Sequence, residues 1–173
     1  MSNYVIRFVN ARIGYDEPII KDITLNIPRP SLTTILGPNG SGKTTLLRAI
    51  IKYAKVFGGY MYIDGKDINE LSIEDLPRYL SYSPAEIYSQ MALTVLDVVM
   101  SSRNGDGWVN RDDALAALKY LGVGNIVGRR FDELSTGQKR LVLIARALAS
   151  RAPLLLLDEP TSNLDLGNKY RVI

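Results

Sequence analysis

The string Gly-Pro-Asn-Gly-Ser-Gly-Lys-Thr at residues 37–44 matches the pattern G-x-x-x-x-G-K-[ST] at every fixed position. Its glycines permit positive φ, so successive backbone N–H groups can converge on one anion. Lys43 adds a positive charge, and Thr44 begins a helix whose first N–H groups face the loop and whose hydroxyl suits Mg²⁺. Because residues 31–36 favour a strand and residues 45–51 a helix, we expect a strand, a loop that binds a nucleoside triphosphate, and a helix. The alternative is a glycine-rich turn that only joins two elements.

Composition narrows the chemistry that this chain can perform. Its 173 residues include no cysteine and no histidine, which excludes disulfides, thiolate zinc sites and imidazole bases. The net charge of +3 comes from 21 basic and 18 acidic residues spread along the chain, without the aromatic and basic stripe of single-strand binders. Nucleic acid is therefore not an expected partner. With no signal peptide and no apolar stretch near the ~18 residues of a membrane span, we expect a cytoplasmic protein.

Hydrophobic patterning predicts an α/β organisation. Strands are expected at Tyr4–Val9, Ile19–Ile27, Tyr60–Ile63 and Tyr79–Ser83, and helices between Thr94 and Leu121. No repeat or linker interrupts the chain. We therefore expect a single domain over residues 1–173 with a helical insertion at approximately residues 86–135.

A second candidate site is the run Leu-Leu-Leu-Leu-Asp-Glu at residues 154–159. The leucines suit a strand buried on both faces, and the acids follow at its carboxyl end, where ligands gather in parallel sheets. Asp158 can hold Mg²⁺ directly or through water, and Glu159 can polarise a water molecule aligned with a γ-phosphate. The alternative is a buried strand followed by two solvated acids.

The segment Leu-Ser-Thr-Gly-Gln at residues 134–138 resembles the LSGGQ signature of the ATP-binding cassette (ABC) superfamily. Ser135 and Gln138 also have the spacing of a capping box, and an apolar helical face follows. A capped helix is thus the structural alternative to an anion site. The two interpretations share one geometry, because a helix N-terminus that carries a hydroxyl can bind an anion.

The resemblance covers nearly the whole chain, and it implies an α/β P-loop NTPase with a mostly parallel central sheet, an N-terminal antiparallel β subdomain and a helical insertion. It also implies a head-to-tail dimer, in which each ATP lies between the phosphate loop of one subunit and the signature of the other. The nucleotide-binding residues that it implies are Tyr15, which stacks on adenine, and Gly37, Pro38, Asn39, Gly40, Ser41, Gly42, Lys43, Thr44 and Thr45. The other implied residues are Leu134, Ser135, Thr136, Gly137 and Gln138 for the partner's ATP, Thr44 and Asp158 for Mg²⁺, Glu159 for catalysis, and Asp165 in the D-loop.

Within the superfamily, the run after residue 154 is similar to that of ATPase subunits of importers for iron-siderophore, haem and cobalamin. The resemblance implies an ATPase on the inner face of the cell membrane that energises import of a metal chelate. Its implied partners are a second ATPase subunit, membrane permease subunits and, indirectly, an extracytoplasmic substrate-binding protein. The alternatives are a nucleotide-binding fragment or regulatory module with little hydrolysis, and a soluble ABC ATPase that does not act in transport.

Three positions depart from the family pattern. Ala85 stands where a glutamine of the Q-loop is expected, and Glu86 or Gln90 would have to replace it through a shifted loop. Thr136 replaces the first glycine of the signature, a change that we expect to be tolerated. The chain ends at Ile173, before the strand and the histidine found in relatives, so we expect a C-terminally truncated domain with marginal stability and impaired hydrolysis.

Overall fold

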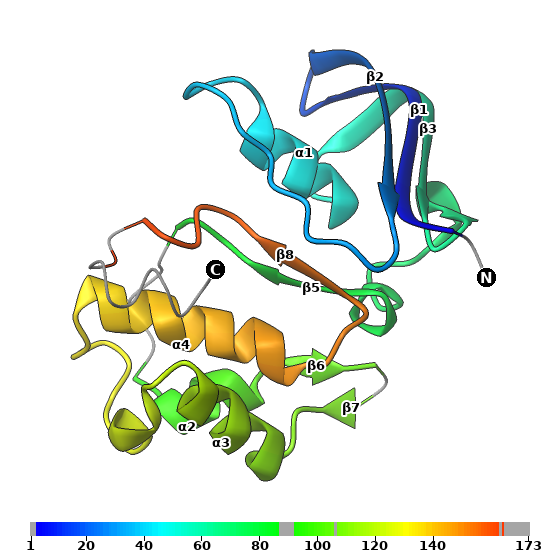
Figure 1. Cartoon of the computed structure of the whole chain (residues 1–173). Coiled ribbons are helices and arrows are strands. Elements are labelled where there is room, and N and C mark those ends of the chain that lie inside the picture. Colours follow the sequence, from blue (N-terminus) through cyan, green and yellow to red (C-terminus); the bar gives the residue numbers. More distant parts are fainter. Residues whose placement is uncertain (1–2, 87–91, 106, 163, 165–173) are drawn as a thin grey trace. The chain divides into compact units, whose positions relative to one another are not determined.

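The computed structural model describes residues 3–86, 92–105, 107–162 and 164. The chain divides into two units, Met1–Tyr79 and Leu80–Ile173 (Figure 1). The organisation as a single domain with an insertion at approximately residues 86–135 stays a prediction.

The first unit is built on an antiparallel sheet with the strand order β2-β1-β3-β4. Alternating apolar residues form its strands, which span β1 (Tyr4–Gly14), β2 (Pro18–Pro28), β3 (Lys55–Ile63) and β4 (Lys66–Asp67). Helix α1 (Lys43–Ile50) packs on this sheet, with the short helices η1 (Ile68–Glu70) and η2 (Leu76–Arg78) after β4. The strands predicted in this unit at Tyr4–Val9, Ile19–Ile27 and Tyr60–Ile63 are confirmed, as is the helix after the phosphate loop. Their buried side chains, which include Phe8, Ile13, Met61 and Ile50, form the core of this unit.

The strand predicted at residues 31–36 is wrong. These residues have no regular secondary structure, and the side chains of Leu32 and Leu36 are 88% and 87% exposed. A strand is stabilised by pairing and by packing of its side chains. No described strand pairs with this segment, so its β-forming residues have no neighbouring strand to stabilise them as a strand.

The second unit contains a parallel strand pair and a group of helices. Its elements are β5 (Leu80–Ser83), α2 (Val95–Met100), β6 (Arg103–Asn104), β7 (Gly107–Trp108), α3 (Arg111–Tyr120), η3 (Gly124–Ile126), α4 (Thr136–Ala149) and β8 (Leu154–Leu157). Helix α4 lies between the β5–β8 pair on one side and α2 and α3 on the other (Figure 1). This confirms the predicted helices and gives a mixed α/β fold with an antiparallel N-terminal sheet and parallel strands.

Burial of β8 differs from the prediction. Leu156 is buried beside α4, but Leu155, which points to the other face, is 38% exposed. The leucine run was predicted to form a strand buried on both faces, and this is wrong for Leu155 because α4 covers one face of the two-stranded sheet.

Among the described residues, no helix is long and apolar enough to cross a membrane.

Candidate functional site

The loop before α1 has backbone conformations that favour glycine. Gly40 and Gly42 have φ angles of 79° and 90°, in the left-handed region. A Cβ atom on Gly42 would lie 3.0 Å from Ile20 Cγ1, whereas nothing lies within 4 Å of a Cβ atom placed on Gly40. The loop is therefore packed against β2 at Gly42 and has open space beside Gly40.

Lys43 directs its charge back over this loop. Its Nζ donates hydrogen bonds to the carbonyl oxygens of Gly37 and Pro38, both at 2.8 Å. Helix α1 begins at Lys43, and Leu46 N donates to Gly42 O at 2.8 Å, so the amides of the first helical turn lie at the loop. The predicted residues 37–45 thus form one continuous junction, in which an ammonium group, backbone amides and the positive end of a helix dipole lie together.

Tyr15 lies in the turn between β1 and β2 and is linked to the same helix. Arg48 Nη1 donates to Tyr15 Oη at 3.4 Å, and the Arg48 guanidinium lies 5.4 Å from the ring centroid of Tyr53. The rings of Tyr15 and Tyr53 meet edge to face, with centroids 6.3 Å apart. Because α1 starts at the phosphate loop and carries Arg48, it connects that loop to Tyr15.

A shallow hollow of about 470 Å³ lies beside this aromatic ring and is lined by Tyr15, Asp16, Glu17 and Ile19. Ile19 also borders the phosphate loop, since its Cγ2 would lie 3.9 Å from a Cβ atom on Gly42. One wall suited to an aromatic base and one loop suited to phosphates therefore lie next to each other within the first unit.

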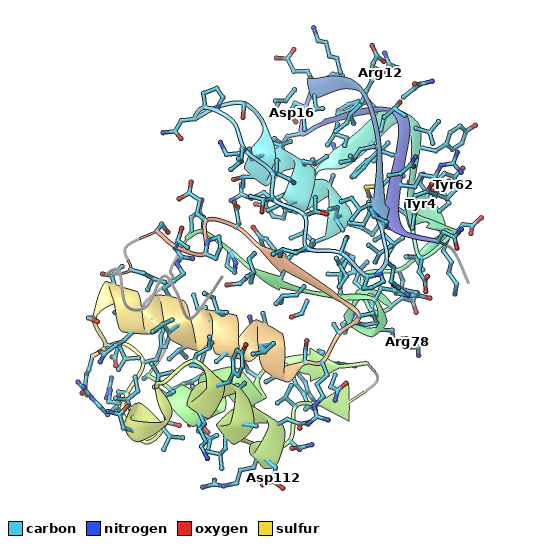
Figure 2. The ribbon with its side chains drawn as sticks, in the orientation of Figure 1. Tyr4, Arg12, Asp16, Tyr62, Arg78 and Asp112 are labelled. Atoms are coloured by element: carbon cyan, nitrogen blue, oxygen red, sulfur yellow. The ribbon has the colours of Figure 1, made fainter. Side chains whose placement is uncertain are left out.

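A second hollow of about 280 Å³ contains none of the predicted site residues and is lined by Tyr4, Arg7, Tyr62 and Gly65. Figure 2 shows Tyr4 and Tyr62 on the face of the sheet that is turned away from α1. This hollow therefore contributes nothing to the phosphate loop.

The two predicted acids follow β8 in the second unit. Asp158 is 4% exposed, its N–H donates to Ser83 O at 3.0 Å, and Tyr82 Oη donates to its Oδ2 at 3.3 Å. Glu159 is exposed and has a φ of 48°, which is uncommon for a residue with a side chain. One carboxylate is thus held inside at the carboxyl end of the sheet, and the next is directed to the surface.

Asp158 and Ser83 place a carboxylate and a hydroxyl at this end of the sheet, the oxygen ligands that Mg²⁺ takes in proteins. The Ser83 Oγ atom is buried without a hydrogen-bond partner, and Ser83 pairs with Leu157, directly before Asp158. The described residues contain no cluster of three or more metal-ligating side chains. Mg²⁺ often takes only one or two protein carboxylates plus substrate phosphates, so one buried aspartate suffices. Thr44, the other predicted ligand, belongs to the first unit, and its pairing with Asp158 stays a prediction.

The signature segment forms the start of α4. Ser135 is its N-cap, with Gln138 N donating to Ser135 Oγ at 3.3 Å and Ser135 N donating to Gln138 Oε1 at 3.1 Å. This confirms the predicted capping box. Leu134 is buried beneath it, whereas Ser135 and Thr136 are exposed at the helix end. Ser135 and Thr136 can therefore face a second molecule.

Sequence reasoning missed Arg140, which lies in α4 two residues after Gln138 and is only 1% exposed. Its guanidinium donates to Pro84 O at 2.5 Å, to Ala85 O, and to Ser162 Oγ at 3.1 Å. Burial lowers the pKa of Arg140, and the carboxylates of Glu159 and Asp158 oppose that shift. A signal was present in the sequence, because Arg140 lies four residues before Ile144 and so falls on the predicted apolar face.

The remaining predictions concern positions near the ends of the described segments. Ala85 contributes its carbonyl oxygen to Arg140, and Glu86 is exposed. Gln90 and Asp165 lie outside the described residues. Whether Glu86 or Gln90 replaces the Q-loop glutamine therefore stays a prediction.

A family model described as ABC transporter matches residues 20–162. The iron(3+)-hydroxamate import ATP-binding protein FhuC of Bacillus subtilis is 36% identical over 169 residues, which cover 93% of this chain and 63% of FhuC. The chain thus spans less than two thirds of the length of this relative.

Solved structures give the same result. A bacterial Atm1-family ABC exporter with ATP bound superposes with a TM-score of 0.87 at 26% identity, covering 99% of this chain and 32% of the exporter chain. The dimeric structure of MJ0796, a bacterial ABC transporter cassette, superposes with a TM-score of 0.83 at 28% identity, covering 96% of this chain and 79% of that chain. The similarity therefore extends over both units.

Proposed function

This chain belongs to the ABC transporter family, and we propose that it is the ATP-binding and ATP-hydrolysing subunit of a transporter. One observation carries the proposal: Lys43, the left-handed glycines and the start of α1 surround one loop, beside the hollow at Tyr15. That arrangement supplies positive charge and amides for a triphosphate next to a ring for a base.

The nucleotide is proposed to bind with its base against Tyr15 and its phosphates in the loop at residues 37–45. Arg48 and Tyr53 contact Tyr15 and restrict the ring. When Mg²⁺ is bound, it neutralises phosphate charge, and Thr44 and Asp158 are the residues proposed to hold it.

Hydrolysis is assigned to Glu159. Its exposed carboxylate can accept a proton from a water molecule that attacks the γ-phosphate. Lys43 and the loop amides stabilise the negative charge on the transferring phosphoryl group.

A second copy of the subunit is the proposed partner at the signature. Ser135 and Thr136 are exposed at the start of α4 and can contact the γ-phosphate of an ATP held by another chain. The similarity to MJ0796, which is a dimer, supports this arrangement.

Import of an iron chelate is the proposed transport function. The identity of 36% to an iron(3+)-hydroxamate import protein supports it. Membrane permease subunits would form the path for the cargo and hold this chain at the inner face of the membrane. A substrate-binding protein would act outside. A nucleotide-binding module with little hydrolysis is the second candidate, because the side chain of Ala85 has no oxygen for Mg²⁺.

The experiment that tests this function combines binding, turnover and transport. The purified chain is titrated with MgATP by calorimetry, phosphate release is measured, and membrane vesicles that contain the co-expressed permease are assayed for uptake of radioactive iron(3+) hydroxamate. We expect saturable ATP binding, turnover and ATP-dependent uptake. Binding without turnover would favour the second candidate, and no ATP affinity in a folded sample would refute both.

The proposed role of Ser135 predicts a difference between two capped helices. Thr94 caps α2 with the same kind of capping box, so S135A and T94A should each lower the free energy of unfolding by about 1 kcal/mol in urea titrations. Only S135A should also weaken ATP-dependent dimerisation in sedimentation velocity, by about tenfold, because it alone removes a γ-phosphate contact. Equal dimerisation in the two variants would limit Ser135 to helix capping.

A further inference from the structure

Arg140 is the largest side chain that is fully buried in the structure, and no described acidic side chain forms an ion pair with it. Its partners are two backbone carbonyl oxygens and one hydroxyl, and its Nε atom has no partner. A guanidinium group is costly to bury unless its donors are satisfied. An apolar side chain at this point of α4 would avoid that cost, so packing alone does not explain an arginine.

The partners of Arg140 come from two chain segments that flank the candidate acids. Pro84 and Ala85 follow β5, and Ser162 lies shortly after Glu159. The planar guanidinium presents several donors in a fixed arrangement, so one side chain can hold both segments at once.

Ser162 relays this contact to Glu159. Its Oγ accepts from Arg140 Nη2 and donates to the Glu159 carbonyl oxygen at 2.8 Å, and its N–H donates to the same oxygen at 3.1 Å. Glu159 has a φ of 48°, a conformation that must be held by its surroundings. The hydrogen-bonded series Arg140–Ser162–Glu159 supplies that support.

We propose that Arg140 is a positioning residue that fixes the backbone of Glu159 through Ser162 and anchors the loop at Pro84–Ala85 through its carbonyl oxygens. The inference rests on the proposed function, because it assigns Arg140 to the site in which Glu159 activates water. It also gives the loop at Ala85 an attachment that needs no glutamine side chain, since the bonds run to the backbone.

The experiment compares R140M, S162A and R146M. R140M removes all donors while keeping apolar volume, and replacing a buried charge in this way usually preserves folding. Arg146 is the matched control, because it lies on the same helix, its pKa is also lowered by burial, and its Nε donates to Ser101 Oγ at 3.3 Å. Amide hydrogen exchange and the steady-state kcat and KM for ATP are measured for each variant.

We expect R140M to raise exchange at residues 159–162 and at Ala85 and Glu86 by at least about tenfold, because it releases both segments. Its kcat should fall by at least about tenfold with the KM for ATP within about twofold, since ATP binding does not involve Arg140. S162A should raise exchange at residues 159–162 alone, and R146M should change neither region. R140K, which keeps the charge but loses the planar fork, should lie between R140M and the unaltered protein.

Unchanged exchange at residues 159–162 in both R140M and S162A would overturn the proposal. If R140M does not fold, S162A alone carries this test, because Ser162 is only partly buried. Increased exchange in a chain that has no ATP turnover would uphold the anchoring and refute the proposed function, so the two failures are distinguishable.

Discussion

Replacing Lys43 with alanine should lower ATP affinity and turnover by at least about 100-fold, the largest loss that we expect from a single substitution. The Nζ atom lies over the loop, 2.8 Å from both Gly37 O and Pro38 O, where a β- or γ-phosphate would lie in the proposed pose. Calorimetry with MgATP and a phosphate-release assay measure the two losses.

The fold should survive this change, because the Lys43 side chain makes its hydrogen bonds to an exposed loop and not to the core. Its effect on the free energy of unfolding should stay within about 0.5 kcal/mol. K55A is the control, since Lys55 is an exposed residue of β3 in the same unit and should leave ATP binding unchanged. An affinity for ATP in K43A equal to that of K55A would refute the phosphate site.

Local rules explain why much of the fold could be predicted from the sequence. The alternating residues of β1 and β2 bury one face wherever they pair, and the Ser135–Gln138 capping box depends only on spacing along one helix. The phosphate loop was equally predictable, because Gly40 and Gly42 carry positive φ angles that other residues rarely adopt.

The errors concern features that depend on distant parts of the chain. Residues 31–36 have a strand-like composition but no described strand beside them, and Leu155 is exposed because α4 covers the other face of β8. Arg140 was missed for the same reason, since its hydrogen-bond partners come from segments more than fifty residues before it and about twenty residues after it. Arg140 lies four residues before Ile144 in the sequence, but only the fold identified the carbonyl oxygens that it binds.

Replacing Glu159 with glutamine should separate ATP binding from hydrolysis. Glutamine keeps the size of the side chain but cannot accept the proton from the attacking water, so kcat should fall by about 100-fold or more. The affinity for ATP should change by less than about threefold, because the phosphate loop and Tyr15 are intact. Single-turnover phosphate release and calorimetry with MgATP measure the two quantities.

The same substitution should trap the proposed dimer, because ATP that is not hydrolysed keeps two copies associated at their signature helices. Sedimentation velocity with MgATP should therefore give more dimer for E159Q than for the unaltered chain. D112N is the control, since Asp112 is also exposed in the second unit, in α3, and lies away from both the signature and β8 in sequence. Turnover in E159Q equal to that in D112N would mean that a group other than Glu159 activates the water, and the Arg140–Ser162–Glu159 series would then have a structural role alone.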